Sequence, residues 1–72
     1  YPNPGHSFLN VELPQEGPTE LILLDFNGRP VLRKPTLERQ TRLSIGELPA
    51  GAYLLQAILP QGTVSQRVMV VR

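Results

Sequence analysis

The chain has 72 residues, a formal net charge of +1 and no cysteine. This length allows one small domain with a thin core, and the lack of cysteine excludes a disulfide framework or a thiolate metal site. A net charge so close to zero gives no electrostatic basis for binding nucleic acid or an anionic membrane. The sequence has no secretory leader pattern and no long apolar run. We therefore expect Tyr1 to be a domain boundary, with any export leader upstream of it.

Prolines and glycines, eight and six of them, interrupt the chain at short intervals. This spacing disfavours helices and predicts short strands joined by turns. Residues 1–7 contain two prolines, an asparagine and a glycine, and are interpreted as an extended lead-in. Residues 8–72 are expected to form the folded domain.

The first predicted strand, residues 8–13, alternates apolar and polar side chains. This pattern directs Leu9, Val11 and Leu13 to one face. Pro14 ends the strand because proline cannot donate a hydrogen bond to a ladder.

The next predicted strand, residues 20–26, is apolar on both faces as far as Asp25, so we expect it to be central in its sheet. Asn27 and Gly28 follow, and both tolerate the positive φ of a tight type I′ hairpin. The return strand, residues 30–34, is expected at a sheet edge because it begins with proline and carries charges.

Residues 35–40 have the weakest pattern, and a seventh strand near Leu37 stays open. Alternation resumes in residues 41–45, where Leu43 and Ile45 are expected to point inward.

A corner over residues 46–51 follows, in which Pro49 and Gly51 suit the second and fourth positions of a type I turn. The strand after it, residues 52–59, places Tyr53 just beyond the corner. In immunoglobulin-like sandwiches, a tyrosine at such a position bonds its hydroxyl to the upstream backbone. We predict that structural role for Tyr53.

The last predicted strand, residues 63–71, follows a hairpin loop and places Val64, Val68 and Val70 on one face. Two sheets packed face to face would bury the apolar faces of all these strands. The sequence therefore predicts an all-β, immunoglobulin-like antiparallel sandwich of six or seven short strands.

Residues with catalytic potential form no recognisable pattern. His6 is the only histidine and lies in the proline-rich lead-in, so we interpret it as exposed and incidental. A Ser–His–Asp arrangement with Asp25 lacks any supporting local motif. The carboxylates are scattered along strands and loops. We predict no catalytic, metal or cofactor site, and a protein that is not an enzyme.

Two features have both a structural and a binding interpretation. Asp25 and Arg29 flank the first hairpin, and we favour a turn-capping aspartate paired with the arginine. Residues 68–71 are apolar on both faces of the last strand. That segment is interpreted either as core or as an edge strand whose free backbone accepts a partner strand.

Four segments of the chain carry a family resemblance. They are Tyr1-Pro2-Asn3-Pro4, then Asp25, Gly28 and Arg29 followed by Val31, then Leu48-Pro49-Ala50-Gly51 with Tyr53-Leu54-Leu55, and last Gln66-Arg67-Val68-Met69-Val70-Val71-Arg72. In this order and across the whole chain, they resemble the type A C-terminal sorting domain of the type IX secretion system. The last segment departs from the family pattern by having arginine in place of lysine and one additional apolar residue.

The resemblance implies an immunoglobulin-like domain attached to a cargo protein of certain Gram-negative bacteria. The cargo would cross the inner membrane by a separate N-terminal signal, and outer-membrane export machinery would then recognise the folded domain. A sortase would usually cut near or before Tyr1 and could join the cargo to a surface lipopolysaccharide. The cargo would reach the cell surface or the extracellular space. The expected partners are the export machinery, the sortase and the cargo, with no nucleic acid, cofactor or small-molecule substrate.

The resemblance also divides the signature residues into two sets. The candidate recognition residues are Arg67, Val68, Met69, Val70, Val71 and Arg72. The structural signature consists of Pro2, Asn3, Pro4, Asp25, Gly28, Arg29, Leu48, Pro49, Gly51 and Tyr53.

Two other functions remain open at this point. An accessory or carbohydrate-binding module of a secreted enzyme would need an exposed aromatic strip on a sheet face. The chain has no tryptophan and four other aromatic residues, of which we expect two to be buried. A structural spacer between domains would need further chain after Arg72.

Overall fold

The structure is a computed structural model that describes residues 8–71. This part of the chain forms six strands and no helix. The strands are β1 (Phe8–Glu12), β2 (Thr19–Leu24), β3 (Pro30–Thr36), β4 (Gln40–Ser44), β5 (Gly51–Leu59) and β6 (Gly62–Val70). Within residues 8–71, no helix is long and apolar enough to cross a membrane.

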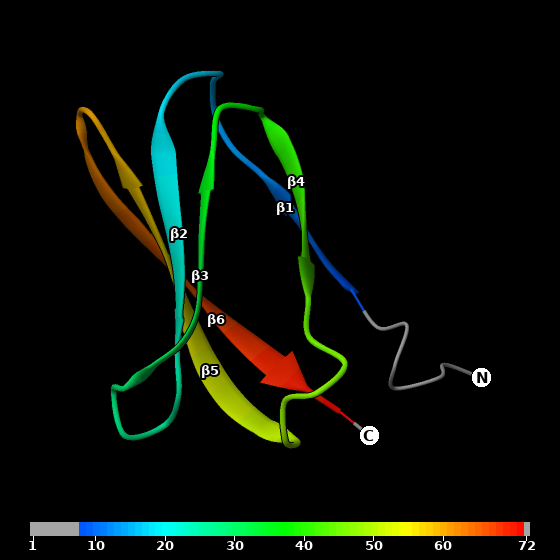
Figure 1. Cartoon of the computed structure of the whole chain (residues 1–72). Coiled ribbons are helices and arrows are strands. Elements are labelled where there is room, and N and C mark those ends of the chain that lie inside the picture. The colour runs from blue at the N-terminus through cyan, green and yellow to red at the C-terminus, as the bar shows by residue number, and fades with distance from the viewer. Residues whose placement is uncertain (1–7, 72) are drawn as a thin grey trace.

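The strands form two sheets that face each other (Figure 1). One sheet has four strands in the order β3-β2-β5-β6, and the other pairs β1 with β4. All pairings are antiparallel. The short connection from β3 to β4, residues 37–39, carries the chain from the larger sheet to the smaller one. This is the two-layer solution expected for strands with one apolar face.

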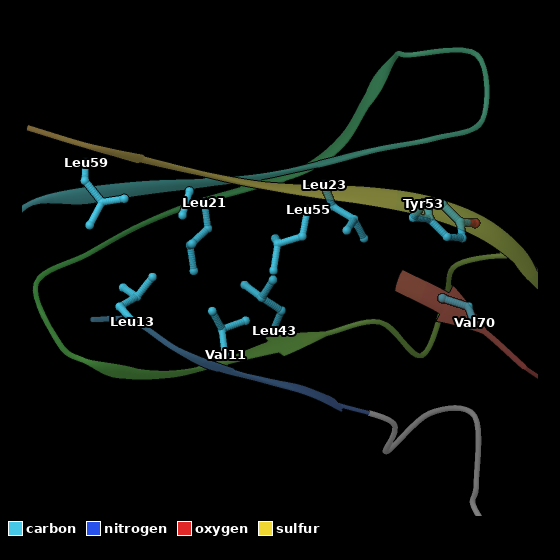
Figure 2. Close-up of a cluster of buried hydrophobic side chains, with 10 residues drawn as sticks. Val11, Leu13, Leu21, Leu23, Leu43, Tyr53, Leu55, Leu59 and Val70 are labelled. Carbon is cyan, nitrogen blue, oxygen red and sulfur yellow. The ribbon is translucent and has the colours of Figure 1, made fainter. Parts of the chain in front are cut away.

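The core fills the space between the two sheets (Figure 2). Its most deeply buried side chains are Leu21 and Leu23 of β2 and Leu43 of β4. The rest of the buried cluster comprises Val11, Leu13, Tyr53, Leu55, Ala57, Leu59 and Val70. These positions alternate along their strands, so the period of two in the sequence produces the inward face.

The predicted strands are confirmed, with end points that differ by one or two residues. The strand over residues 20–26 is central, as predicted, and even its outward-facing Ile22 is only 8% exposed. The seventh strand that was left open near Leu37 does not form in the described chain. Leu37 instead lies in the β3–β4 connection and is 69% exposed.

Candidate recognition surface

The turn between β2 and β3 is built around the side chain of Asp25. Its Oδ1 accepts hydrogen bonds from the backbone N–H groups of Asn27 and Arg29, both at 2.9 Å. Its Oδ2 lies 3.4 Å from Nε of Arg29. The predicted turn-capping role and the pairing with Arg29 are therefore confirmed.

These contacts lower the pKa of Asp25 below its ordinary value. The main cause is the hydrogen bond from the backbone N–H of Arg29, which favours the charged carboxylate. Desolvation opposes the shift, while the N–H of Asn27 and the charge of Arg29 add to it. The carboxylate is therefore engaged by its own turn.

The type I′ geometry predicted for this hairpin is wrong. No residue other than glycine has a positive φ in the described chain, so Asn27 cannot occupy a type I′ position. Instead, the N–H of Gly28 bonds to the carbonyl of Asp25 at 2.9 Å, and Gly28 takes φ = 82°. This is the three-residue loop in which a type I turn precedes a left-handed glycine.

Tyr53 fixes a second corner at the same end of the larger sheet, where the chain enters β5. Its hydroxyl donates a 2.6 Å hydrogen bond to the carbonyl oxygen of Pro49, and its ring is buried in the core. The predicted structural role of Tyr53 is confirmed. The hydrogen-bonded turn in this corner lies earlier than expected, because the N–H of Leu48 bonds to the carbonyl of Ile45 at 3.1 Å.

The candidate recognition residues lie on β6, which is an edge strand of the larger sheet. Val70 is buried and Val68 packs against the core, whereas Met69 and Val71 are 61% and 79% exposed. The interpretation as core therefore fits Val68 and Val70. The interpretation as an exposed edge fits Met69 and Val71. Arg72, like Pro2, Asn3, Pro4 and His6, lies outside the described residues.

The two edges of the four-stranded sheet differ in chemistry. The β3 edge carries two prolines and two cations, features that discourage pairing with another strand. The nine residues of β6 include one charge, that of Arg67, and no proline. The β6 edge is thus long and weakly protected, a combination that favours addition of a partner strand.

The register shows which β6 residues face the free edge. Leu59 and Gly62 enclose a two-residue loop, a position where the pair exchanges both backbone hydrogen bonds. Such pairs alternate with pairs whose N–H and C=O groups point away. It follows that Thr63, Ser65, Arg67 and Met69 direct their backbone groups toward the free edge.

A hollow at one end of the outer sheet face was not foreseen from the sequence. It has a volume of about 490 Å³ and lies between the β2–β3 turn and β6. Its lining comprises Leu24, Asp25, Phe26, Gly28, Ala52, Tyr53, Leu54, Arg67 and Met69. The apolar patterns of β2 and β5 in the sequence predict buried faces. The strand order β2-β5-β6, which these patterns do not predict, places the outward-facing residues of β2 and β5 beside β6.

Potential catalytic or metal-binding residues do not gather in the described chain. No group of three or more histidine, cysteine, aspartate or glutamate side chains in residues 8–71 could hold a metal. Of the three described aromatic side chains, Tyr53 is buried, Phe26 is 87% exposed, and Phe8 packs under Arg42 at 4.0 Å. They lie in different places and form no aromatic strip on a sheet face.

The fold and these contacts define a small antiparallel β-sandwich with a tyrosine-anchored corner and an open edge strand. The family model described as "Secretion system C-terminal sorting domain" matches residues 1–71. The chain therefore belongs to this family, the C-terminal sorting domains of the type IX secretion system. Searches of curated proteins and of solved structures gave no match.

Membership establishes the general role of the domain. It is a targeting module that marks a cargo protein for handling by the type IX machinery. The cargo is destined for the cell surface or the extracellular space.

Proposed function

We propose that residues 8–72 act as a folded label, and that the type IX machinery binds this label to move the cargo across the outer membrane. The family match over residues 1–71 carries the proposal. A label must offer an extended surface, and the two sheets of this small domain do so.

The contact that we propose is the free edge of β6 together with residues 67–72. Four outward-directed backbone positions on this edge offer hydrogen bonds to an added strand. The opposite edge, β3, is blunted by its prolines and charges. This difference supports β6 over β3 as the docking edge.

We further propose that a sortase of the type IX system removes the domain by cutting near or before Tyr1. Such a cut would leave the sandwich intact, because β1 begins at Phe8.

Transplantation tests the proposal. Residues 1–72 are fused to the C-terminus of a periplasmic reporter in a type IX host, and the surface reporter is quantified by protease accessibility on whole cells. We expect surface exposure that is lost when the host's type IX machinery is inactivated. A reporter that stays in the periplasm of the intact host would disprove the sorting role for this chain.

The same cells test the sortase step. The mass of the surface reporter should show cleavage between the reporter and β1. A surface reporter that keeps all 72 residues would contradict the sortase step and leave export itself supported.

A further inference from the structure

The outer-face hollow combines an apolar lining with the cation of Arg67, which has no ion-pair partner among residues 8–71. Leu54 is 37%, Met69 61% and Phe26 87% exposed, so their apolar surfaces meet solvent together at this end of the sheet. Elsewhere on the same face, Ile22 is only 8% exposed, and neighbouring Arg33 forms a 3.0 Å ion pair with Glu20. Ile58, on the same face but away from the hollow, is 39% exposed, less than Met69 or Phe26.

The cation and the carboxylate that line the hollow, Arg67 and Asp25, do not form an ion pair with each other. Arg67 makes no ion pair with any residue in the range 8–71. The one carboxylate in the lining, Asp25, is occupied by Arg29 and by two backbone N–H groups. The guanidinium of Arg67 is therefore available for a carboxylate from outside the domain.

We propose that this hollow binds an acidic-apolar segment of the protein partner that docks on β6. A carboxylate of the segment pairs with Arg67, and the neighbouring apolar side chain lies against Leu54 and Met69. This inference rests on the proposed sorting function and adds to it the chemistry of the partner.

The position of the hollow allows one partner segment to contact both the hollow and the free edge of β6. Arg67 and Met69 line it from β6, the same strand whose free edge is open to a partner. A strand added there would place alternate side chains on the outer face beside these two residues. The flexible thioether of Met69 can adapt to the apolar side chain that it meets.

An anionic membrane surface is the competing occupant. It is disfavoured because the net charge of the chain is only +1 and the hollow contains a single unpaired cation. The concave shape also suits an inserted side chain better than a flat lipid surface.

The first test is export of the reporter fusion with Arg67→Glu. We expect surface reporter to fall about tenfold or more, as for loss of one charge-assisted contact. Arg33→Glu is the matched control, because Arg33 is an arginine on the same outer face but lies at the opposite edge of the sheet and outside the hollow. It should export as the parent does, and circular dichroism should show that both variants are folded.

The second test identifies the partner segment. A photo-crosslinking amino acid replaces Met69 in the fusion, with Arg33 on the opposite sheet edge as the control site. We expect position 69 to crosslink to an export-machinery segment that contains Asp or Glu beside apolar residues. Reversing that acidic charge to Arg should restore export of the Arg67→Glu fusion.

The inference is overturned if folded Arg67→Glu exports like the parent, or if position 69 crosslinks only to lipid or to a segment without acidic residues. Failure of the charge reversal to restore export also overturns it. In each case the parent fusion still reaches the surface, so the sorting function survives. A parent fusion that is not exported would instead disprove the function on which the inference rests.

Discussion

Asp25 and Tyr53 position the chain at the end of the sandwich where the proposed recognition surface lies. Asp25 closes the β2–β3 turn through two backbone N–H groups and Arg29. Tyr53 bonds the carbonyl of Pro49 at the entrance to β5. Both side chains act by holding backbone, and both residues border the hollow that Arg67 also lines.

Asp25→Asn should make stability less dependent on pH. The pKa of Asp25 is lowered in the folded state, so its contribution to stability is present above the ordinary pKa of 3.8 and is lost as the pH falls through the folded pKa. We expect Asp25→Asn to lower the urea midpoint at pH 7 and to approach the parent under strongly acidic conditions. Glu16→Gln, at an exposed loop position, is the control. A constant deficit from neutral to acidic pH would contradict this assignment.

Tyr53→Phe should remove the bond to Pro49 while keeping the buried ring. We expect the free energy of unfolding to fall by about 1 kcal/mol, which lowers the Tm of a domain this small by about 4–8 °C. Phe26→Leu, at an 87% exposed aromatic, should leave Tm unchanged. Equal melting of Tyr53→Phe and the parent would show that the hydroxyl does not anchor the corner.

At the scale of elements, the alternation of apolar and polar residues predicts which segments form strands but not which strands pair with one another. Leu9, Val11 and Leu13 share a face in both the prediction and the structure, because the side-chain period of a strand is two. Leu37 is apolar, but an isolated apolar residue in a polar connection has no face to bury and remains exposed.

The recognition surface could be predicted only in part. The sequence alone shows the apolar segment that ends with Val71. It also shows that this strand has no proline and only one charge, so its edge is weakly protected against pairing. The contribution of Leu24 and Leu54 depends on the order β2-β5-β6, a long-range property that no local pattern encodes. The hairpin type was mispredicted because Gly28 alone takes the positive φ that both Asn27 and Gly28 tolerate.

The alternation of backbone directions on β6 leads to a prediction about folding. Ser65→Pro removes an N–H that points to the free edge, so the ladder to β5 should survive. Gln66→Pro removes an N–H that bonds to β5, and the proline ring clashes within the ladder. The free energy of unfolding should therefore fall by about 3 kcal/mol or more. In urea unfolding, the Gln66→Pro variant should therefore unfold at a lower urea concentration than the Ser65→Pro variant. Equal destabilisation by both would contradict the register that we derive.

For the whole molecule, stability depends on a small core that no disulfide reinforces. An order-of-magnitude estimate for 72 residues is about 4–11 kcal/mol. The two-stranded sheet contributes Val11, Leu13 and Leu43 to the buried cluster. A label that must be recognised in folded form is therefore sensitive to single core substitutions.

Leu43→Ala should destabilise the domain strongly, because Leu43 is 1% exposed. We expect a loss of about 2–5 kcal/mol in urea unfolding, which is a large share of the total. Leu37→Ala, at a 69% exposed position, should change stability by less than about 0.5 kcal/mol. A small effect at Leu43 would show that the two sheets are not packed as the structure shows.

The central claim is that the free edge of β6 on a folded sandwich is what the export machinery binds. The most direct measurement compares surface export of the reporter fused to residues 1–72 carrying Ser65→Pro or Arg33→Pro. Ser65 and Arg33 have equivalent outward backbone positions on opposite edges of the same sheet. With both variants confirmed as folded, we predict that Ser65→Pro abolishes surface exposure and that Arg33→Pro does not. Normal export of folded Ser65→Pro would contradict the account.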